Sequence, residues 1–256
     1  HLFSGLAEYN AAVIVPAVRF YRAAGYLPAL ELAGGLARFA LRRSDGYRPD
    51  GSLFCPHPGS LADHFHTRSN FILGVLELGL VTGQREYIAW ARQSFERARE
   101  FGSAFGWFPE GLGHRHGEVC GITDMLEIAL NLGMHVDPLY LGDAERFGRN
   151  HLLESQFLSI DRLESAVNRL PAEETDMDPK LSTADGVTAS QVGGFASRSS
   201  LNDAFHLDAC AMMQCCNAAG TRGLYDLWRY AVTTLPARRD DYARVRVNLR
   251  LSVENE

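Results

Sequence analysis

The chain has 256 residues, of which 46% are hydrophobic and 22% are charged, and its formal net charge at pH 7 is -6. This composition excludes a largely disordered chain, and the negative charge, with no cluster of Lys and Arg among aromatic residues, argues against nucleic acid as a partner. No run of about 18 uninterrupted apolar residues occurs, which argues against a membrane span.

Helical periodicity dominates, and two kinds of segment alternate. Residues 70–81, NFILGVLELGLV, are apolar nearly all the way round, which is typical of a helix buried on all sides. Residues 86–101 carry apolar side chains on one face and charged ones elsewhere, which indicates an outer, amphipathic helix. Gly83, in the TGQ turn between them, is expected to end the first helix.

The same order of an inner and then an outer helix recurs along the chain. The other expected helices cover residues 8–21, 27–41, 123–132, 143–156 and 221–233. Repeated helical hairpins of about 40 to 50 residues predict an all-α domain and, more specifically, an (α/α)6 toroid whose inner helices surround a central pocket. About four hairpins are visible where a closed toroid needs about six, so the toroid is expected to be incomplete. An ordinary helical bundle is the alternative.

Two stretches depart from this pattern. Residues 158–202 are rich in Ser, Asp, Gly and Pro, and an excursion of this length favours a functional loop. Residues 243–253, ARVRVNLRLSV, alternate with period two and predict a strand, which must join a sheet because a lone strand is not stable. The chain begins at His1 within a helical pattern, so we expect a fragment or a processed product.

The five cysteines are an odd number in a chain too large to need disulfide bridges, which favours reduced or metal-bound thiols. Cys55 and Cys210 have no partner at a useful spacing and are expected to be structural. The remaining cysteines lie in the two motifs described next.

Two motifs far apart in the chain carry candidate metal ligands. The stretch HGEVCGITDM, at 116–125, places Glu118 and Cys120 at the start of an expected helix, and MMQCCNAAG, at 212–220, contains Cys215 and Cys216. Thiolate is a strong ligand for zinc and carboxylate an acceptable one, so the four residues could fill a tetrahedral shell. Adjacent helical residues point about 100° apart, so both cysteines reach one ion only at a helix end or in a turn. The alternative is that the thiols are small buried hydrophobes.

The E-x-C motif at 118–120 and the C-C-N motif at 215–217, followed by RGLYDLW, resemble the β-L-arabinofuranosidase family of glycoside hydrolases. The resemblance runs from about His64 to the C-terminal strand. It implies an α/α toroid followed by β-sandwich domains, so residues 1–235 would form the toroid and residues 236–256 the linker and first strand of a sandwich.

The resemblance also implies that Zn²⁺ is held by Glu118, Cys120, Cys215 and Cys216, and that Cys215 is the nucleophile. Zinc and the start of a helix would both favour a thiolate at neutral pH. The implied function is that of a retaining hydrolase that cleaves a terminal furanoside, such as a β-L-arabinofuranoside, from a carbohydrate substrate.

Such a reaction needs a proton donor, for which Glu110 in FGWFPEGLG is the candidate. Its neighbours Trp107 and Phe108 predict an apolar environment that raises the carboxyl pKa. In the family that the motifs resemble, the acid/base glutamate also precedes E-x-C, which supports the choice. The alternative is a loop glutamate that faces solvent.

Three further residues are candidates for substrate binding. His64 and Thr67, in DHFHTRSN, match an H-x-x-T pattern that in this family places a histidine facing the sugar, and His66 could serve equally. Trp107, together with Phe108 and Phe195, could offer the flat apolar surface on which sugars stack. Capping or core roles are the alternatives for the histidines, and Asp63 is a plausible N-cap for their helix.

His114 and His116, in HRH, could meet one ion if the loop is extended, although solvent or pocket-rim positions are favoured. Two other functions stay open: a non-catalytic glycan-binding toroid with a structural zinc site, and a sugar isomerase or epimerase on the same scaffold. The sequence carries no signal for the oligomeric state, and the cytoplasm is slightly favoured as the compartment.

Overall fold

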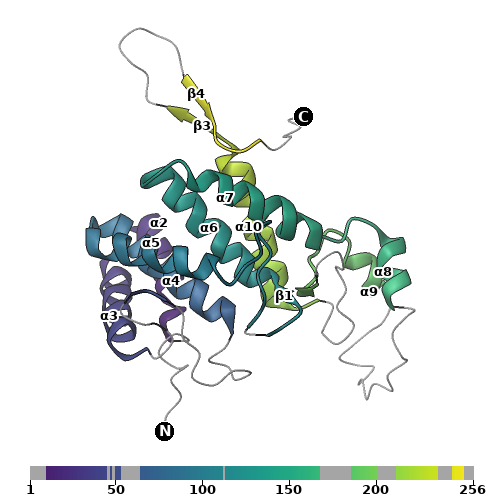
Figure 1. The fold of residues 1–256 in the computed structure, drawn as a ribbon, viewed down its shortest axis with the longest axis horizontal. Helices are drawn as coiled ribbons and strands as arrows, with labels where there is room; N and C mark the ends of the chain where they lie inside the picture. Colours follow the sequence, from purple (N-terminus) through teal and green to yellow (C-terminus); the bar gives the residue numbers. More distant parts are fainter. Residues whose placement is uncertain are drawn as a thin grey trace.

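A computed structural model describes residues 10–44, 47, 50–52, 64–111, 113–167, 186–200, 212–235 and 244–250. Most of these residues are helical, and the strands among them form two sheets of two strands each. The fold is therefore all-α, as predicted. Figure 1 shows most of the helices as one packed body, with two short helices, α8 (Ile160–Val167) and α9 (Val187–Ser190), at its side and a C-terminal hairpin of β3 (Val232–Leu235) and β4 (Arg244–Val247) projecting from it.

The helices alternate between an inner and an outer position, as the sequence pattern predicts. The inner helices pack against one another in the order α2, α4, α6 and α10, while α3, α5 and α7 pack against α2, α4 and α6 respectively. The helix bounds are α2 Ile14–Ala24, α3 Leu27–Arg43, α4 Phe65–Thr82, α5 Arg85–Arg99, α6 Val119–His135, α7 Tyr140–Phe147 and α10 Gln214–Ala231. Closure of these layers into a ring stays a prediction.

The pair α4 and α5 confirms the two periodicities. Apolar side chains of α4 are buried on every side, whereas α5 buries the face that carries Ala91 and Phe95 and leaves Arg92 exposed. Gly83 ends α4 in the left-handed conformation, with φ of 71°, which glycine adopts without steric cost. Helix α4 begins at Phe65, within the stretch DHFHTRSN that was expected to open this helix, and its first turns bury polar side chains.

Buried charges join the inner helices. Arg19 on α2 forms ion pairs with Glu77 of α4 at 2.6 Å and with Glu127 of α6 at 2.5 Å. Arg222 on α10 binds the same Glu127 and also Asp124, the latter at 3.2 Å. Since each of these carboxylates has a cationic partner, their burial does not leave an uncompensated charge in the core.

Helix α10 begins at Gln214, earlier than the predicted 221–233. Gly220 was expected to precede the helix, but both Gly220 and Gly223 lie inside it, where their lack of a side chain permits close packing. A Cβ atom on Gly220 would lie 2.4 Å from the ring of Phe195, and one on Gly223 would lie 2.8 Å from Leu152. The cysteine pair therefore lies in the first turn of α10, which is a helix end as the metal hypothesis requires.

The predicted helix over 143–156 is only partly α-helical. After α7 the chain continues through a π-helical turn, Gly148–Leu152, and a 3-10 turn, Leu153–Ser155. A Cβ atom on Gly148 would lie 2.8 Å from Leu227, so the changed winding occurs where this segment meets α10. Apolar spacing alone does not distinguish these helix types.

The long excursion contains α8 (Ile160–Val167), α9 (Val187–Ser190) and β2 (Arg198–Ser199). Strand β2 pairs antiparallel with β1 (Gly117–Glu118), with Gly117 opposite Ser199 and Glu118 opposite Arg198. This pairing brings the end of the excursion to the start of α6, where the E-x-C motif lies.

The strand expected near the C-terminus is confirmed as β4 (Arg244–Val247). It pairs antiparallel with β3 (Val232–Leu235), which continues directly from α10. Strand β3 was not predicted, since residues 232 and 233 were assigned to the last helix and a domain boundary was placed at 235. The β-branched sequence VTT nevertheless favours a strand. A β-sandwich beyond this hairpin stays a prediction.

Three predictions, for Cys55, Asp63 and Cys210, fall outside the described residues. Among the residues described, no helix combines the length and the apolar character needed to cross a membrane.

Candidate metal centre and active site

The two cysteine motifs meet because two helices begin side by side. Glu118 immediately precedes α6 in an extended conformation, and Cys120 lies in the first turn of that helix. Cys215 and Cys216 lie in the first turn of α10. The helices are held together at this end by the Thr123 hydroxyl, which donates to the backbone oxygen of Ala219 at 3.2 Å.

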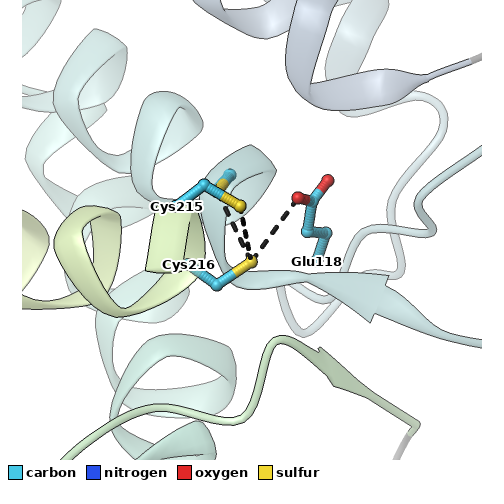
Figure 2. A group of neighbouring side chains, drawn as sticks. Glu118, Cys215 and Cys216 are labelled. Carbon is cyan, nitrogen blue, oxygen red and sulfur yellow. Dashed lines mark hydrogen bonds between the residues drawn. The ribbon is translucent and has the colours of Figure 1, made fainter. Parts of the chain in front are cut away.

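The ligand atoms of these residues form one compact group (Figure 2). The Sγ atom of Cys216 lies 3.5 Å from that of Cys120, 3.8 Å from that of Cys215 and 3.5 Å from Oε1 of Glu118. All four ligand atoms lie within 4.8 Å of one another. The predicted meeting of Glu118, Cys120, Cys215 and Cys216 is confirmed.

The donor set and its spacing fit a tetrahedral metal ion. Sulfur ligands about 2.3 Å from a tetrahedral zinc are separated by about 3.8 Å, close to the distances between these sulfurs. Three sulfurs and one carboxylate oxygen also suit a borderline-soft divalent ion. The group could therefore hold a metal ion, and the identity of that ion as zinc stays a prediction.

The three sulfurs differ in exposure and acidity. Cys120 and Cys216 are buried, whereas Cys215 is exposed. The hydrogen bond from Cys120 lowers the pKa of the Cys216 thiol, while the same bond and burial raise the pKa of Cys120. Burial also raises the pKa of Cys215. In the absence of a cation, the protein thus favours only one thiolate, on Cys216.

Glu118 is held as a carboxylate by two histidines. Burial alone would raise its pKa, but the hydrogen bond and charge of His64 and the nearby charge of His66 lower it to about 2. The Nε2 atom of His64 lies 2.5 Å from Oε2 of Glu118, and its Nδ1 atom lies 3.2 Å from the Thr67 hydroxyl. The H-x-x-T motif therefore orients an imidazole against the candidate ligand.

His66 has a different environment. Its Nδ1 atom lies 2.7 Å from Asp124, and burial, which lowers the pKa of the imidazole, is outweighed by that carboxylate, so the pKa rises to about 9. The rings of His64 and His66 are 5.7 Å apart. His66 thus presents a positive charge next to His64, paired with a core carboxylate.

Glu110 lies in a charged environment, so the expected apolar setting is wrong. Its Oε1 atom accepts a hydrogen bond from Arg198 at 2.8 Å, and its Oε2 atom lies 2.6 Å from Nε2 of His116. The Nε2 atom of His64 lies 3.9 Å from Oε1 of Glu110. The neighbouring Phe108 packs in the core, where its ring lies 5.4 Å from that of Phe65 and 5.1 Å from that of Phe147. Glu110 is buried, which also rules out a loop glutamate that faces solvent.

The cysteine cluster shares Glu118 with a second group of potential ligands. His64, Glu110 and Glu118 offer ligand atoms within 4.8 Å of one another, and Glu118 also belongs to the cysteine cluster. The backbone fixes this arrangement, since the Glu110 carbonyl accepts a hydrogen bond from the N–H of Phe65 at the start of α4. Glu118 therefore links the group that contains Glu110 to the cluster that contains Cys215.

Two of the three aromatic residues considered for sugar stacking are buried in the core. Phe108 and Phe195 are 3% and 1% exposed, so neither ring is open to a sugar. Trp107 is half-buried, and its ring stacks on the buried His151 at a centroid distance of 6.1 Å, beside β1. Phe108 and Phe195 are therefore packing residues, a role that composition alone does not distinguish from sugar stacking, and sugar binding by Trp107 stays a prediction.

Sequence reasoning missed Arg198 and Asp124. Arg198 lies in the Ser-rich end of the excursion and reaches Glu110 only because β2 pairs with β1. Asp124, in the GITDM stretch of α6, is fully buried and accepts hydrogen bonds from Ser69 and Asn70 besides its contact with His66. A carboxylate on the buried side of an inner helix is the signal that could have identified it.

The inner helices also line a cavity of about 430 Å³. Its walls include the ion-paired Arg19, Glu77, Glu127 and Arg222, one from each inner helix, together with Asp226. Burial and the adjacent Glu127 raise the pKa of Asp226 to about 7. The cysteine cluster is not part of this lining, since it lies where α6 and α10 begin.

Comparison with known proteins adds no assignment. No model of a protein family matches the chain, and no curated protein matches it.

Proposed function

We propose that the chain is a retaining glycoside hydrolase that cleaves a terminal furanoside, such as a β-L-arabinofuranoside, with Cys215 as nucleophile and Glu110 as acid/base. The observation that carries this proposal is the exposure of Cys215, the single exposed sulfur of a cluster whose other described cysteines are buried. A substrate can reach this sulfur while the buried pair and Glu118 hold the ion.

Zinc bound by the four residues would keep the Cys215 sulfur deprotonated at neutral pH, which the protein alone does not do because burial raises the pKa of this thiol. Helix α10 begins at the cysteine pair, and its dipole adds to the stability of a thiolate there. The site therefore combines an accessible sulfur with the means to ionise it.

In the proposed reaction, the Cys215 sulfur attacks the anomeric carbon while the bond from that carbon to the leaving oxygen breaks. Glu110 gives its proton to that oxygen, and the product is a thioglycosyl enzyme. Glu110, now a carboxylate, then takes a proton from a water molecule, whose oxygen attacks the anomeric carbon and releases the Cys215 thiolate. Two inversions at this carbon give net retention.

The contacts of Glu110 hold its carboxyl group in place. Arg198 holds Oε1, and the short contact between Oε2 and Nε2 of His116 provides a second place for the proton. His64 is partly exposed beside Glu118, so its ring could contact a bound sugar. These side chains supply polar contacts that a furanose ring requires.

The test is to incubate protein loaded with one equivalent of zinc with nitrophenyl β-L-arabinofuranoside and related furanosides and pyranosides. We expect release of nitrophenol with retained configuration in the sugar product, followed by NMR. The Glu110→Gln variant should accumulate a glycosyl adduct on the peptide that contains Cys215, detected by mass spectrometry. Cys215→Ser is the matched control, because it removes the sulfur and must give no adduct.

Two outcomes would replace this proposal. Saturable sugar binding without turnover would favour the glycan-binding function, and interconversion of a free sugar, unaffected by Cys215→Ser, would favour an isomerase or epimerase.

A further inference from the structure

A second cluster of potential ligands lies in the loop between Glu110 and His116. The N–H of Glu110 donates to the carbonyl of His116 at 2.9 Å, and the N–H of His114 donates to the carbonyl of Gly111 at 3.1 Å. The carbonyl of Glu110 is fixed in turn by the N–H of Phe65. The loop is thus closed at its base and anchored to α4, which fixes the side chains that it carries.

These side chains bring two imidazoles to one carboxylate oxygen. Oε2 of Glu110 lies 2.6 Å from Nε2 of His116 and 4.0 Å from Nδ1 of His114, and the two imidazole rings are 5.1 Å apart. One ligand atom from each residue lies within 4.8 Å of the others. Ligands about 2.1 Å from one tetrahedral ion lie about 3.4 Å apart, so binding of an ion requires the rings to rotate until the three atoms reach this spacing.

The environment of His114 points to a ligand. Its Nδ1 atom is buried and has no hydrogen-bond partner among the described residues, although its side chain as a whole is 34% exposed. A buried imidazole nitrogen without a partner is unfavourable, and a metal ion would satisfy it. The exposed part of the ring leaves a path by which an ion can enter.

Arg198 does not block this arrangement. It occupies Oε1 of Glu110, the oxygen opposite the two imidazoles, and so fixes the carboxylate with Oε2 directed toward them. Carboxylate ligands are commonly held in this way by a hydrogen bond from a neighbouring group. Two imidazoles and one carboxylate suit zinc, cobalt or nickel and leave coordination positions open for water.

We propose that Glu110, His114 and His116 bind a second divalent transition-metal ion, separate from the one held by the cysteine cluster. A further consequence rests on the proposed function: an ion on Oε2 of Glu110 occupies the atom that must exchange a proton with the leaving group. The second ion is therefore an inhibitor, so the hydrolase works with one ion per chain and slows when a second one binds.

Cobalt titration of the metal-free full chain distinguishes the two sites. Co²⁺ in the cysteine cluster gives sulfur-to-metal charge-transfer absorption, whereas Co²⁺ on imidazole and carboxylate does not. We expect two equivalents to bind, of which one produces this absorption. The variant with His114→Ala and His116→Ala together should bind one equivalent and keep the absorption, and the retained absorption also shows that the variant is folded.

His135→Ala is the matched control, because His135 is an exposed histidine at the far end of α6 from the cysteine motif. This variant should bind both equivalents. A wild-type chain that binds only one equivalent, or a double variant that still binds two, overturns the proposal.

Zinc inhibition tests the functional consequence separately. Turnover of the wild type should fall as the second equivalent binds, and His114→Ala should move the midpoint to about tenfold higher zinc or more, since loss of even an outer-shell partner has this effect. Two bound equivalents without furanoside turnover would leave the site standing and reject the proposed function. Turnover that does not change with the second equivalent would reject the inhibitory role.

Discussion

The sulfur of Cys216 lies 3.5 Å from a carboxylate oxygen of Glu118, although 98 residues separate them in the chain. Each residue is at the N-terminal end of its helix, and α6 and α10 pack so that these ends coincide. The contact therefore depends on the tertiary fold, and an ion bound there would stabilise the packing of the two helices in return.

The first prediction concerns removal of the metal. A chelator should lower the melting temperature of the metal-loaded chain, because an ion that binds only the folded state adds about 2.7 kcal/mol when its concentration is 100 times its dissociation constant. Calorimetry with and without chelator measures the difference. Cys216→Ser should melt below the metal-loaded wild type and show a smaller chelator effect, because it loses a ligand of the cysteine cluster. An unchanged melting temperature in the chelated wild type would contradict a tightly held ion.

The second prediction compares two glycines. A Cβ atom on Gly117 of β1 would lie 2.2 Å from the backbone oxygen of Phe108, so Gly117→Ala must displace the strand that precedes Glu118. We expect a loss of about 2 to 3 kcal/mol in unfolding free energy, as in other overpacked sites, and weaker metal binding. Urea unfolding and metal titration measure the two effects.

Gly35, inside α3, is the control, since a Cβ atom there would meet nothing within 4 Å. Gly35→Ala should stabilise the chain by about 0.5 to 1 kcal/mol, because alanine is the better helix former. Equal effects of the two substitutions would mean that the close approach at Gly117 is not formed in solution.

The third prediction concerns pH. The pKa of Asp226 is raised from its ordinary value of 3.8 to about 7, so between these values the folded chain holds a proton that the unfolded chain has lost. The raised pKa of Asp226 therefore lowers the free energy of unfolding as the pH rises from about 4 to 7. Asn is neutral throughout and can still donate to Glu127, so Asp226→Asn should be more stable than wild type by about 1 kcal/mol at pH 8, after allowance for solvent screening.

At pH 4 the Asp226→Asn variant and the wild type should unfold at the same urea concentration. Glu31→Gln, at an exposed position of α3, controls for the removal of one negative charge. If Glu31→Gln gives the same gain at pH 8, the effect comes from net charge and not from the buried contact with Glu127.

The sequence pattern predicted the parts of this structure that depend on local periodicity. The buried α4 and the one-sided α5 follow from the spacing of apolar residues, and the cysteine cluster follows from residue types with a shared chemistry. It could not predict the position of Arg198, because that side chain reaches Glu110 only through the pairing of two short strands. The environment of Glu110 was misjudged for the same reason, since its nearest neighbours in sequence are not its neighbours in space.

The start of α10 shows a second limit of local rules. Gly220 has the residue type of a helix end, yet the ring of Phe195 occupies the space that any side chain at this position would need. Tertiary packing, and not local preference, selects this glycine. Phe195 belongs to the long excursion, so the early start of the helix could not be inferred from the segment itself.

The last prediction separates the two proposed catalytic residues. Cys215→Ser should abolish turnover, because it removes the exposed sulfur and weakens the metal site. Glu110→Gln should leave the ion in the cysteine cluster bound, since Glu110 is not one of its ligands, and should slow turnover by about 10² to 10⁴-fold for substrates with poor leaving groups. A good leaving group needs less protonation to depart, so nitrophenyl furanosides should lose less. Steady-state rates over a series of leaving groups, with metal content measured on the same samples, provide the comparison. If Glu110→Gln hydrolyses substrates with poor leaving groups at the wild-type rate, Glu110 is not the acid. The next candidate for the acid is then His116, whose Nε2 atom lies 2.6 Å from Oε2 of Glu110.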